Sequence, residues 1–261
     1  ERGVGLGVDG WAFLGKDRDW AFGGWGGFTN VSGSESRIFS LQHNSSHYFQ
    51  RPDAEHVELD SNATSLRGHA GRLSLNKENG NVMFNAALGW ISPGFESNDL
   101  GITRSTDIIN KHIGVGYRWT ERGEYIRSAR ADVIYATNHD FDMVKTADVM
   151  FGMGYISFVN FWSVSVDGGY SGEVLNDRAL RGGPRGIEVP ELFFSAGMSS
   201  DHRKDLSMHT SVSFGSESDG GNNSGLSVEL NAKLGSRLNL SFGPNMYRTT
   251  DMNQYIRRVS D

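Results

Sequence analysis

Hydrophobic and polar residues alternate along most of this chain. In the segment 206–214, leucine, methionine, threonine, valine and phenylalanine occupy successive alternate positions, and serine or histidine lies between them. The segments 82–90 and 226–234 also carry an apolar residue at every second position. Because successive side chains of a strand point to opposite faces, this pattern predicts β-strands whose two faces meet different environments. No segment shows a convincing helical period, so the pattern predicts no helix.

The alternating segments predict about thirteen strands. We place them near residues 3–14, 19–31, 37–45, 67–76, 82–91, 110–119, 124–136, 144–155, 161–171, 191–199, 205–215, 225–234 and 237–244.

The connections between these strands alternate in length. Tight turns are expected at 32–36, 77–81, 121–124, 159–160, 201–205 and 235–237, where glycine, asparagine and charged residues are typical of hairpins. Long polar connections are expected near 46–66, 92–109, 172–190 and 216–224, with a shorter one near 137–142. A chain with short connections on one side and long ones on the other is predicted to be an up-and-down meander with unequal ends.

Two architectures fit an antiparallel meander of this kind. A transmembrane β-barrel of the bacterial outer membrane has alternating strands, short periplasmic turns and long outer loops. A soluble β-sandwich also alternates, but its connections usually mix hairpins with crossovers. The loop asymmetry therefore favours an all-β segment of a large outer-membrane barrel. Because such barrels use an even number of strands, we expect residues 1–261 to form part of a single, incomplete barrel domain.

Composition narrows the function classes. The chain carries a net charge of −6 and no basic cluster, which argues against nucleic-acid binding. It has no cysteine, so disulfides, thiolate metal sites and a cysteine nucleophile are excluded. The richest apolar run, residues 149–162, is broken by glycine, serine and asparagine and is too short for a membrane-spanning helix.

Several short phrases resemble one bacterial protein family. They are FQRPDA (residues 49–54), SPGFE (92–96), NDLG (98–101), RGGP (181–184), SDHRKDLSM (200–208) and Gln254-Tyr255, and they recur in order over most of the chain. The sequence resembles the proteins grouped as domain of unknown function 5916, which are usually labelled carbohydrate binding family 9 domain-containing proteins.

The resemblance implies a carbohydrate-binding-like sandwich followed by a large outer-membrane β-barrel. This chain resembles the barrel region, and we expect that module and the remaining barrel strands to lie outside it. The resemblance supplies no catalytic residues and no sugar-binding site for these residues.

The insert at 92–107 interrupts the alternation and carries acidic residues. Glu96 and Asp99 suggest calcium, because hard cations prefer carboxylates, but the spacing lacks the repeat of an EF-hand loop. We favour a folded outer loop in which Pro93-Gly94 turns the chain, Phe95 anchors it, and Asn98 or Asp99 binds the local backbone.

Arginines gather in a second long connection, at Arg178, Arg181 and Arg185. Guanidinium groups recognise carboxylates and phosphates, so this segment suits either an anionic ligand such as lipopolysaccharide or a structural salt bridge to Asp53 or Glu96. We favour the salt bridge, and the same interpretation applies to Arg51 and Asp53. The candidate outer-loop residues are Arg51, Asp53, Phe95, Glu96, Asn98, Asp99, Arg181 and Arg185.

The chain lacks the motifs of the common catalytic and nucleotide-binding sites. No HExxH, GxSxG or P-loop pattern occurs, so we expect no catalytic residue, metal or cofactor. The sequence predicts a non-enzymatic outer-membrane β-barrel segment with a role in passage, docking or anchoring at the bacterial outer membrane. Its expected partners are membrane lipid, lipopolysaccharide and other envelope proteins or an attached carbohydrate-binding module. The alternative is a soluble, lectin-like extracellular β-sandwich that binds glycans through exposed tryptophan and tyrosine residues.

Overall fold

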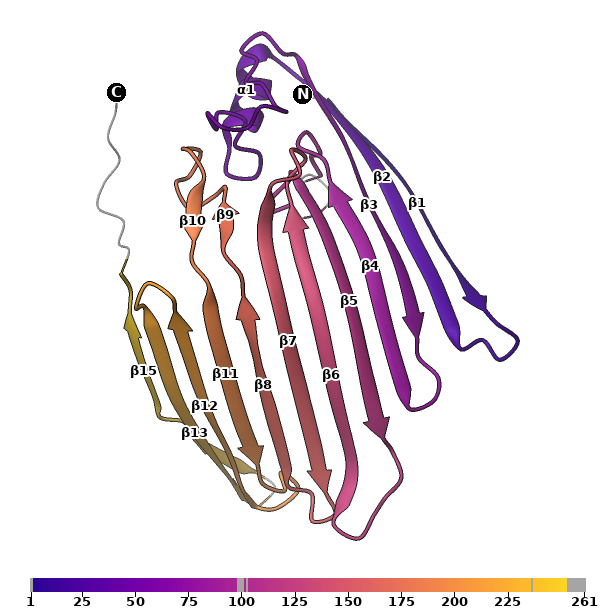
Figure 1. Ribbon diagram of the computed structural model, residues 1–261, viewed down its shortest axis with the longest axis vertical. Coiled ribbons are helices and arrows are strands. Elements are labelled where there is room, and N and C mark those ends of the chain that lie inside the picture. Colours follow the sequence, from indigo (N-terminus) through magenta and orange to yellow (C-terminus); the bar gives the residue numbers. More distant parts are fainter. Residues whose placement is uncertain (1, 98–100, 102, 236, 253–261) are drawn as a thin grey trace. The chain divides into compact units, whose positions relative to one another are not determined.

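The computed structural model describes residues 2–97, 101, 103–235 and 237–252 of the chain. Its elements, in chain order, are β1 (Arg2–Leu14), β2 (Trp20–Ser32), α1 (Glu35–His43), β3 (Ser65–Lys77), β4 (Val82–Ile91), β5 (Ile108–Trp119), β6 (Ile126–His139), β7 (Lys145–Phe158), β8 (Ser163–Ser171), β9 (Val174–Asn176), β10 (Gly186–Glu188), β11 (Glu191–Ser199), β12 (Leu206–Glu217), β13 (Asn222–Leu234), β14 (Leu238–Phe242) and β15 (Asn245–Thr250). Figure 1 labels them along the chain.

The strands form a single large meander. A thirteen-stranded sheet follows the order β1 to β8 and then β11 to β14, with β15 also paired to β13, while β9 and β10 form a separate two-stranded ribbon. This confirms the predicted all-β antiparallel meander. Among the described residues, no helix is long and apolar enough to cross a membrane.

The strand predicted at 37–45 is wrong, because these residues form the helix α1. Ser34 caps its first turn by accepting a hydrogen bond from the Arg37 amide, and Glu35 lies next to the positive end of the helix dipole. Ile38 and Leu41 lie one turn apart and are buried. The tight hairpin expected at 32–36 is therefore the entry to this helix.

α1 covers a small core at one end of β2 and β3. Val31, Ile38, Leu41 and Leu66 form this core, with Phe49 and Ala63 packed against it. The apolar stripe of α1 is thus buried by the ends of two strands, which explains why a short helix interrupts the meander at this point.

The last strand of the sheet is interrupted. β14 pairs with residues 230–234 of β13, and β15 pairs with residues 222–227 of the same strand. Pro244 lies between β14 and β15; it has no amide hydrogen to donate, but its carbonyl accepts a hydrogen bond from the Val228 amide. The main sheet therefore has the predicted number of thirteen strands, although one expected strand is a helix, and β9, β10 and β15 were not expected.

The connections also differ from expectation at two places. The predicted long connection at 216–224 is a short turn at 218–221, because β12 and β13 extend further than the apolar pattern does. Serine and asparagine continue the strands there without adding apolar residues, so the hydrophobic periodicity does not reveal the strand ends. The long connection at 172–190 contains the β9–β10 ribbon.

The chain divides into two compact units, which we describe separately. Unit 1 comprises residues 1–115, 134–149 and 173–188, and unit 2 comprises residues 116–133, 150–172 and 189–261.

In unit 2 the pairing register sorts the side chains by polarity. Val212 of β12 lies opposite Ala196 of β11 and Leu226 of β13. The neighbouring Ser211 lies opposite Gly197 and Ser227. Since paired residues share a face of the sheet, the apolar rows of adjacent strands merge into one apolar face and the serine-rich rows merge into a polar face.

In unit 1 the segment 92–97 crosses β3 at very short range. The Ser92 amide donates to the His69 carbonyl at 2.8 Å, and the Glu96 amide donates to Thr29 Oγ1 at 3.0 Å. A Cβ placed on Gly68 would lie 2.1 Å from the Phe95 nitrogen. Only glycine therefore allows the loop to lie against the strand.

We predict that Gly68→Ala lowers the free energy of unfolding by about 1–3 kcal/mol, because the added methyl group collides with the backbone of the crossing loop. Chemical denaturation checks this. Gly10→Ala is the matched control, since a Cβ at Gly10 has nothing within 4 Å. Equal effects of both substitutions would contradict the close approach of residues 92–97 to β3.

Candidate functional site

Several loops of unit 1 meet in one cluster of charged residues. We define the loop cluster as residues 44–56, 92–97, 103–107, 140–144 and 176–185. In Figure 1, α1 and the loop that follows it lie at the same end of the strands as the β9–β10 ribbon. The long connections that the sequence predicted as outer loops thus supply most of the cluster.

Arg51 lies at the centre of the loop cluster. Its side chain is buried, with a relative exposure of 1%, and its Nη2 donates to Asp107 Oδ2 at 2.5 Å. The Nη1 atom donates to Asp177 Oδ2, and Nε donates to the Tyr48 carbonyl at 3.2 Å. A buried guanidinium is stable only when its charge and its donors are matched, and here two carboxylates match them.

Asp107 joins Arg51 to a histidine. His56 Nε2 lies 2.8 Å from Asp107 Oδ1, and His56 Nδ1 lies 2.8 Å from Asp142 Oδ2. Asp107 Oδ1 also accepts a hydrogen bond from the Phe141 amide at 3.0 Å. Both ring nitrogens therefore face carboxylates, which favours the doubly protonated ring.

The charges around His56 set its protonation. Burial lowers the pKa of His56, but the hydrogen bond to Asp142 and the charge of Asp107 outweigh burial and raise the pKa above its ordinary value. Burial raises the pKa of Asp142, yet the contacts with His56 and Arg185 dominate and lower it. The imidazolium and the carboxylate thus stabilise each other.

Arg185 ties the β9–β10 connection to two other loops. Its backbone amide donates to Asp53 Oδ2 and its Nη1 donates to the Asp53 carbonyl, both at 2.6 Å. Its Nη2 donates to Asp140 Oδ2 at 2.6 Å and lies 3.5 Å from Asp142 Oδ2. Asp140 is fully buried and also accepts from the Val144 amide at 2.8 Å. One arginine therefore holds residues that are far apart in sequence.

Arg178 makes a third set of cross-links through backbone carbonyls. Its Nη1 donates to the Ser45 carbonyl at 2.9 Å, and its Nη2 donates to the Thr106 carbonyl at 2.7 Å. The guanidinium carbon lies 5.6 Å from the centroid of the Tyr48 ring, within the range of a cation–π contact. Arg178 thus satisfies carbonyls of two loops that have no strand partners.

The candidate residues from the sequence fall into several places. Arg51, Asp53 and Arg185 lie in the loop cluster, and Asp53, one of the two partners suggested for the arginines, contacts Arg185. Glu96 is buried, 3.9 Å from His47 Nε2, and Phe95 is half-buried beside β3. Arg181 is exposed in a turn with a positive φ of 52°. Asn98 and Asp99 lie outside the described residues.

The acidic half of this site was not predicted from the sequence. Asp107 and Asp177 are the carboxylate partners of Arg51, Asp140 and Asp142 are those of Arg185, and His56 contacts Asp107 and Asp142. The one available signal was their position, because each lies in a connection or at the edge of a strand. Spacing in the sequence does not identify them.

The chemistry of the loop cluster is that of a set of cross-links. The carboxylates of Asp107 and Asp140 each contact an arginine and a backbone amide. Within the described ranges, no group of three or more histidine or acidic side chains is placed to hold a metal ion. The geometry therefore supports a rigid arrangement of loops.

We predict that Arg51→Ala lowers the free energy of opening of the loop cluster by about 3–5 kcal/mol, because it leaves two carboxylates without their buried partner. The rate of chymotrypsin cleavage within residues 176–185 measures this opening. Arg104→Ala, which removes an exposed arginine from the 103–107 segment of the loop cluster, is the control and is expected to change this free energy by less than about 0.5 kcal/mol. Similar cleavage of both variants would contradict a central role for Arg51.

The loop cluster is also expected to depend on pH. Folding raises the pKa of His56. Its contribution to the stability of the loop cluster is therefore complete below the unfolded-state pKa of about 6.5 and is lost as the pH rises through the folded-state pKa. Asp142 contributes in the opposite sense, above about 3.8, and its contribution is lost as the pH falls through its lowered pKa. The cluster is thus most stable between these limits.

Amide hydrogen exchange at Phe141, corrected for the intrinsic rate, reports this dependence from about pH 5 to about pH 9. We expect protection to fall at the alkaline end in the wild type and to show no such step in His56→Gln. His43→Gln, at an exposed position on α1, should keep the wild-type profile. An unchanged step in His56→Gln would assign the titration to another group.

Comparison with known proteins places the chain in a family. No curated protein matches the sequence. A solved structure titled "Structure of porin refined at 1.8 angstroms resolution" is similar, with 12% sequence identity, a TM-score of 0.49, and coverage of 94% of this chain and 86% of that chain. The family model described as "Domain of unknown function (DUF5916)" matches residues 26–261. The chain therefore belongs to the DUF5916 family.

Proposed function

We propose that this chain forms part of the wall of a non-enzymatic β-barrel in the bacterial outer membrane, and that it anchors the ordered loop cluster at the cell surface. The observation that carries this proposal is an exposed apolar face of unit 2 that is continuous over several strands. Soluble proteins rarely leave such a face uncovered.

Large apolar side chains that would otherwise belong in a core are exposed on this face. Leu192, Leu206 and Phe242 in unit 2 are exposed by 60%, 68% and 67%. Leu6 and Val8 in unit 1 are also exposed, and they occupy alternate positions of β1. Hydrocarbon chains cover such a face without a second layer of protein, and the backbone hydrogen bonds of each inner strand are already made within the sheet.

The opposite face in unit 2 is polar and its side chains bind one another. Ser195 donates to Asp167 at 2.7 Å, and Ser199 lies 2.8 Å from His209 Nδ1. Asn231 donates to Glu229 at 2.8 Å. A row of this kind suits the water-filled interior of a barrel.

The connections support an orientation for the proposed barrel. Outer-membrane barrels carry long loops on the outside and short turns on the periplasmic side. The loop cluster would then lie at the cell surface, held in one arrangement by Arg51, Arg178 and Arg185. We therefore favour a role in anchoring and docking over the free passage of solutes. On the basis of the family resemblance, the proposed protein also includes further barrel strands and a carbohydrate-binding-like module.

A soluble glycan-binding sandwich is the second candidate. The exposed rings of Trp11 and Tyr125, at 73% and 69%, are the observation that favours it, because sugars stack on aromatic faces. A sandwich also needs a second large sheet, and the strands that the structure describes form one large sheet and one ribbon. Extraction separates the two candidates, since a barrel needs detergent and a sandwich does not.

Charge substitution tests the proposed lipid face. Val212→Arg is expected to lower the free energy of unfolding in lipid vesicles by about 2–4 kcal/mol, because it places a charge against the hydrocarbon core. Ser211→Arg is the matched control, since its neighbours across the sheet are Gly197 and Ser227, and it should change stability by less than about 0.5 kcal/mol. Equal tolerance of both arginines would count against the proposal.

A further inference from the structure

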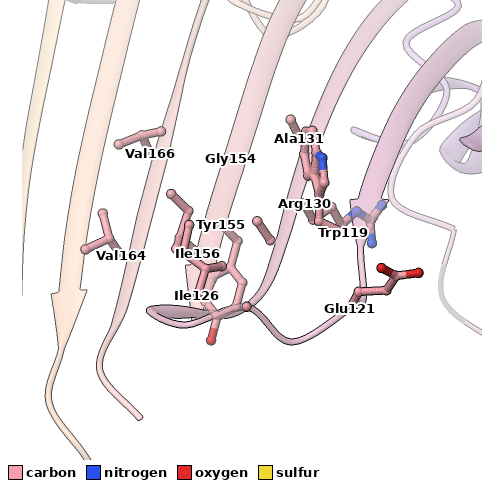
Figure 2. Close-up of a pocket in the computed structure, with 12 residues that line it drawn as sticks. Trp119, Glu121, Ile126, Arg130, Ala131, Gly154, Tyr155, Ile156, Val164 and Val166 are labelled. Carbon is pink, nitrogen blue, oxygen red and sulfur yellow. The ribbon is translucent and has the colours of Figure 1, made fainter. Parts of the chain in front are cut away.

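The short-turn end of unit 2 carries a groove in the apolar face. The groove has a volume of about 570 Å³ and is lined by residues that include Trp119, Ala129, Ala131, Gly154 and Val166. Figure 2 shows Val164 and Val166 along one side and Trp119 and Ala131 along the other. Small side chains between larger ones leave the hollow.

The groove belongs to the same face as the apolar rows of unit 2. Val166 lies opposite Ala196 in the pairing of β8 with β11, and a Cβ on Gly154 would lie 3.3 Å from Val166 Cγ2. Gly154 and Val166 therefore share the face that we propose to meet lipid. A hollow of this shape and polarity fits an acyl chain.

A basic and aromatic site adjoins the groove. Arg127, Ala129 and Ala131 occupy alternate positions of β6 and so share one face, which places Arg127 at the turn end of the groove. The Arg127 guanidinium carbon lies 5.0 Å from the centroid of the Phe161 ring, and that of Arg203 lies 3.1 Å from it. Two guanidinium groups thus share one aromatic ring.

The turns that carry these residues are joined and enclose a second hollow. The Val159 amide donates to the Tyr125 carbonyl at 2.9 Å, which links the β7–β8 turn to the β5–β6 turn. A pocket of about 560 Å³ lies over the β7–β8 and β11–β12 turns and is lined by Phe161, Trp162 and Lys204, among others. Tryptophan and arginine at this level are typical of a membrane interface.

The cations of this site differ in whether they are paired with a carboxylate. Asp201 accepts two hydrogen bonds from Arg203, from Nε at 2.9 Å and from Nη2 at 2.8 Å, and Arg203 holds the pKa of Asp201 well below its usual range. Within the part of the chain that the structure describes, no ion pair joins Arg127 or Lys204 to a carboxylate. These two cations are available to an external anion.

The charges of the turns as a whole nearly balance. The β5–β6 and β11–β12 connections and their flanks carry five basic residues, Arg118, Arg122, Arg127, Arg203 and Lys204, and four acidic ones, Glu121, Glu124, Asp201 and Asp205. Recognition here therefore depends on where the cations lie, around Phe161 beside the groove, and a net negative charge on the ligand is not required.

We propose that this end of unit 2 binds one glycerophospholipid, with an acyl chain in the groove and the phosphodiester between Arg127 and Lys204. The inference rests on the proposed membrane location. It adds a specific lipid-binding site to a face that would otherwise contact lipids non-specifically. The ligand of this site has a phosphate diester and two acyl chains.

Native mass spectrometry of the detergent-solubilised protein tests this proposal, with dioleoyl phosphatidylethanolamine, dioleoyl phosphatidylglycerol and dioleoylglycerol as probes. We expect the two phospholipids to bind equally and dioleoylglycerol to bind about tenfold less, because it lacks the anion that the cations recognise. Arg127→Gln with Lys204→Gln should reduce the binding of both phospholipids to the level of dioleoylglycerol.

Two further variants separate the groove from the charges. Ala131→Phe fills the groove and should weaken the binding of all three probes, whereas Lys16→Gln with Arg18→Gln makes the same charge change on the β1–β2 turn and should leave binding unchanged. Wild-type retention of phospholipid by the Arg127→Gln, Lys204→Gln protein would overturn the lipid site. A protein that stays soluble without detergent would instead overturn the proposed function.

Discussion

The structure depends on a single constraint, the separation of apolar and polar side chains onto opposite faces of one sheet. The ladder hydrogen bonds of each inner strand are made within the sheet, so strand pairing needs no second layer. The apolar face does need a cover, because large apolar residues such as Leu206 and Phe242 are exposed on it. What covers the apolar face therefore decides what the protein is, and hydrocarbon is the cover that we propose.

The loops of unit 1 obey a different rule. Where the chain leaves the sheet, its backbone loses strand partners, and the loop cluster replaces them with charged side chains that bind carbonyls and amides. Arg178 binds two carbonyls and Asp107 accepts from an amide while it binds Arg51. Buried ion pairs of this kind contribute specificity of arrangement more than net stability, which suits a surface that must keep one shape.

Most of the fold was predictable from the sequence, whereas the site was predictable only in part. Period-two alternation located nearly every strand, because each strand has two different faces. α1 escaped because its buried apolar stripe is only two residues long, at Ile38 and Leu41, and because Phe39 and Leu41 alternate with Ser40 and Gln42 as they would in a strand. Arg51 and Arg185 stood out beside glycine and proline turns, but their partners did not. Arg51 binds Asp177 across 126 positions and Asp107 across 56, so no local pattern connects them.

The central claim is that the apolar face of the sheet meets hydrocarbon, and the absence of cysteine allows a direct test at single positions. Val212→Cys and Ser211→Cys, each labelled with a bimane fluorophore, report on opposite faces of the centre of β12. In vesicles of phospholipids with brominated acyl chains, we predict strong quenching of the label at position 212 and little at position 211. Equal quenching at the two positions, or quenching at position 211 alone, would contradict the account.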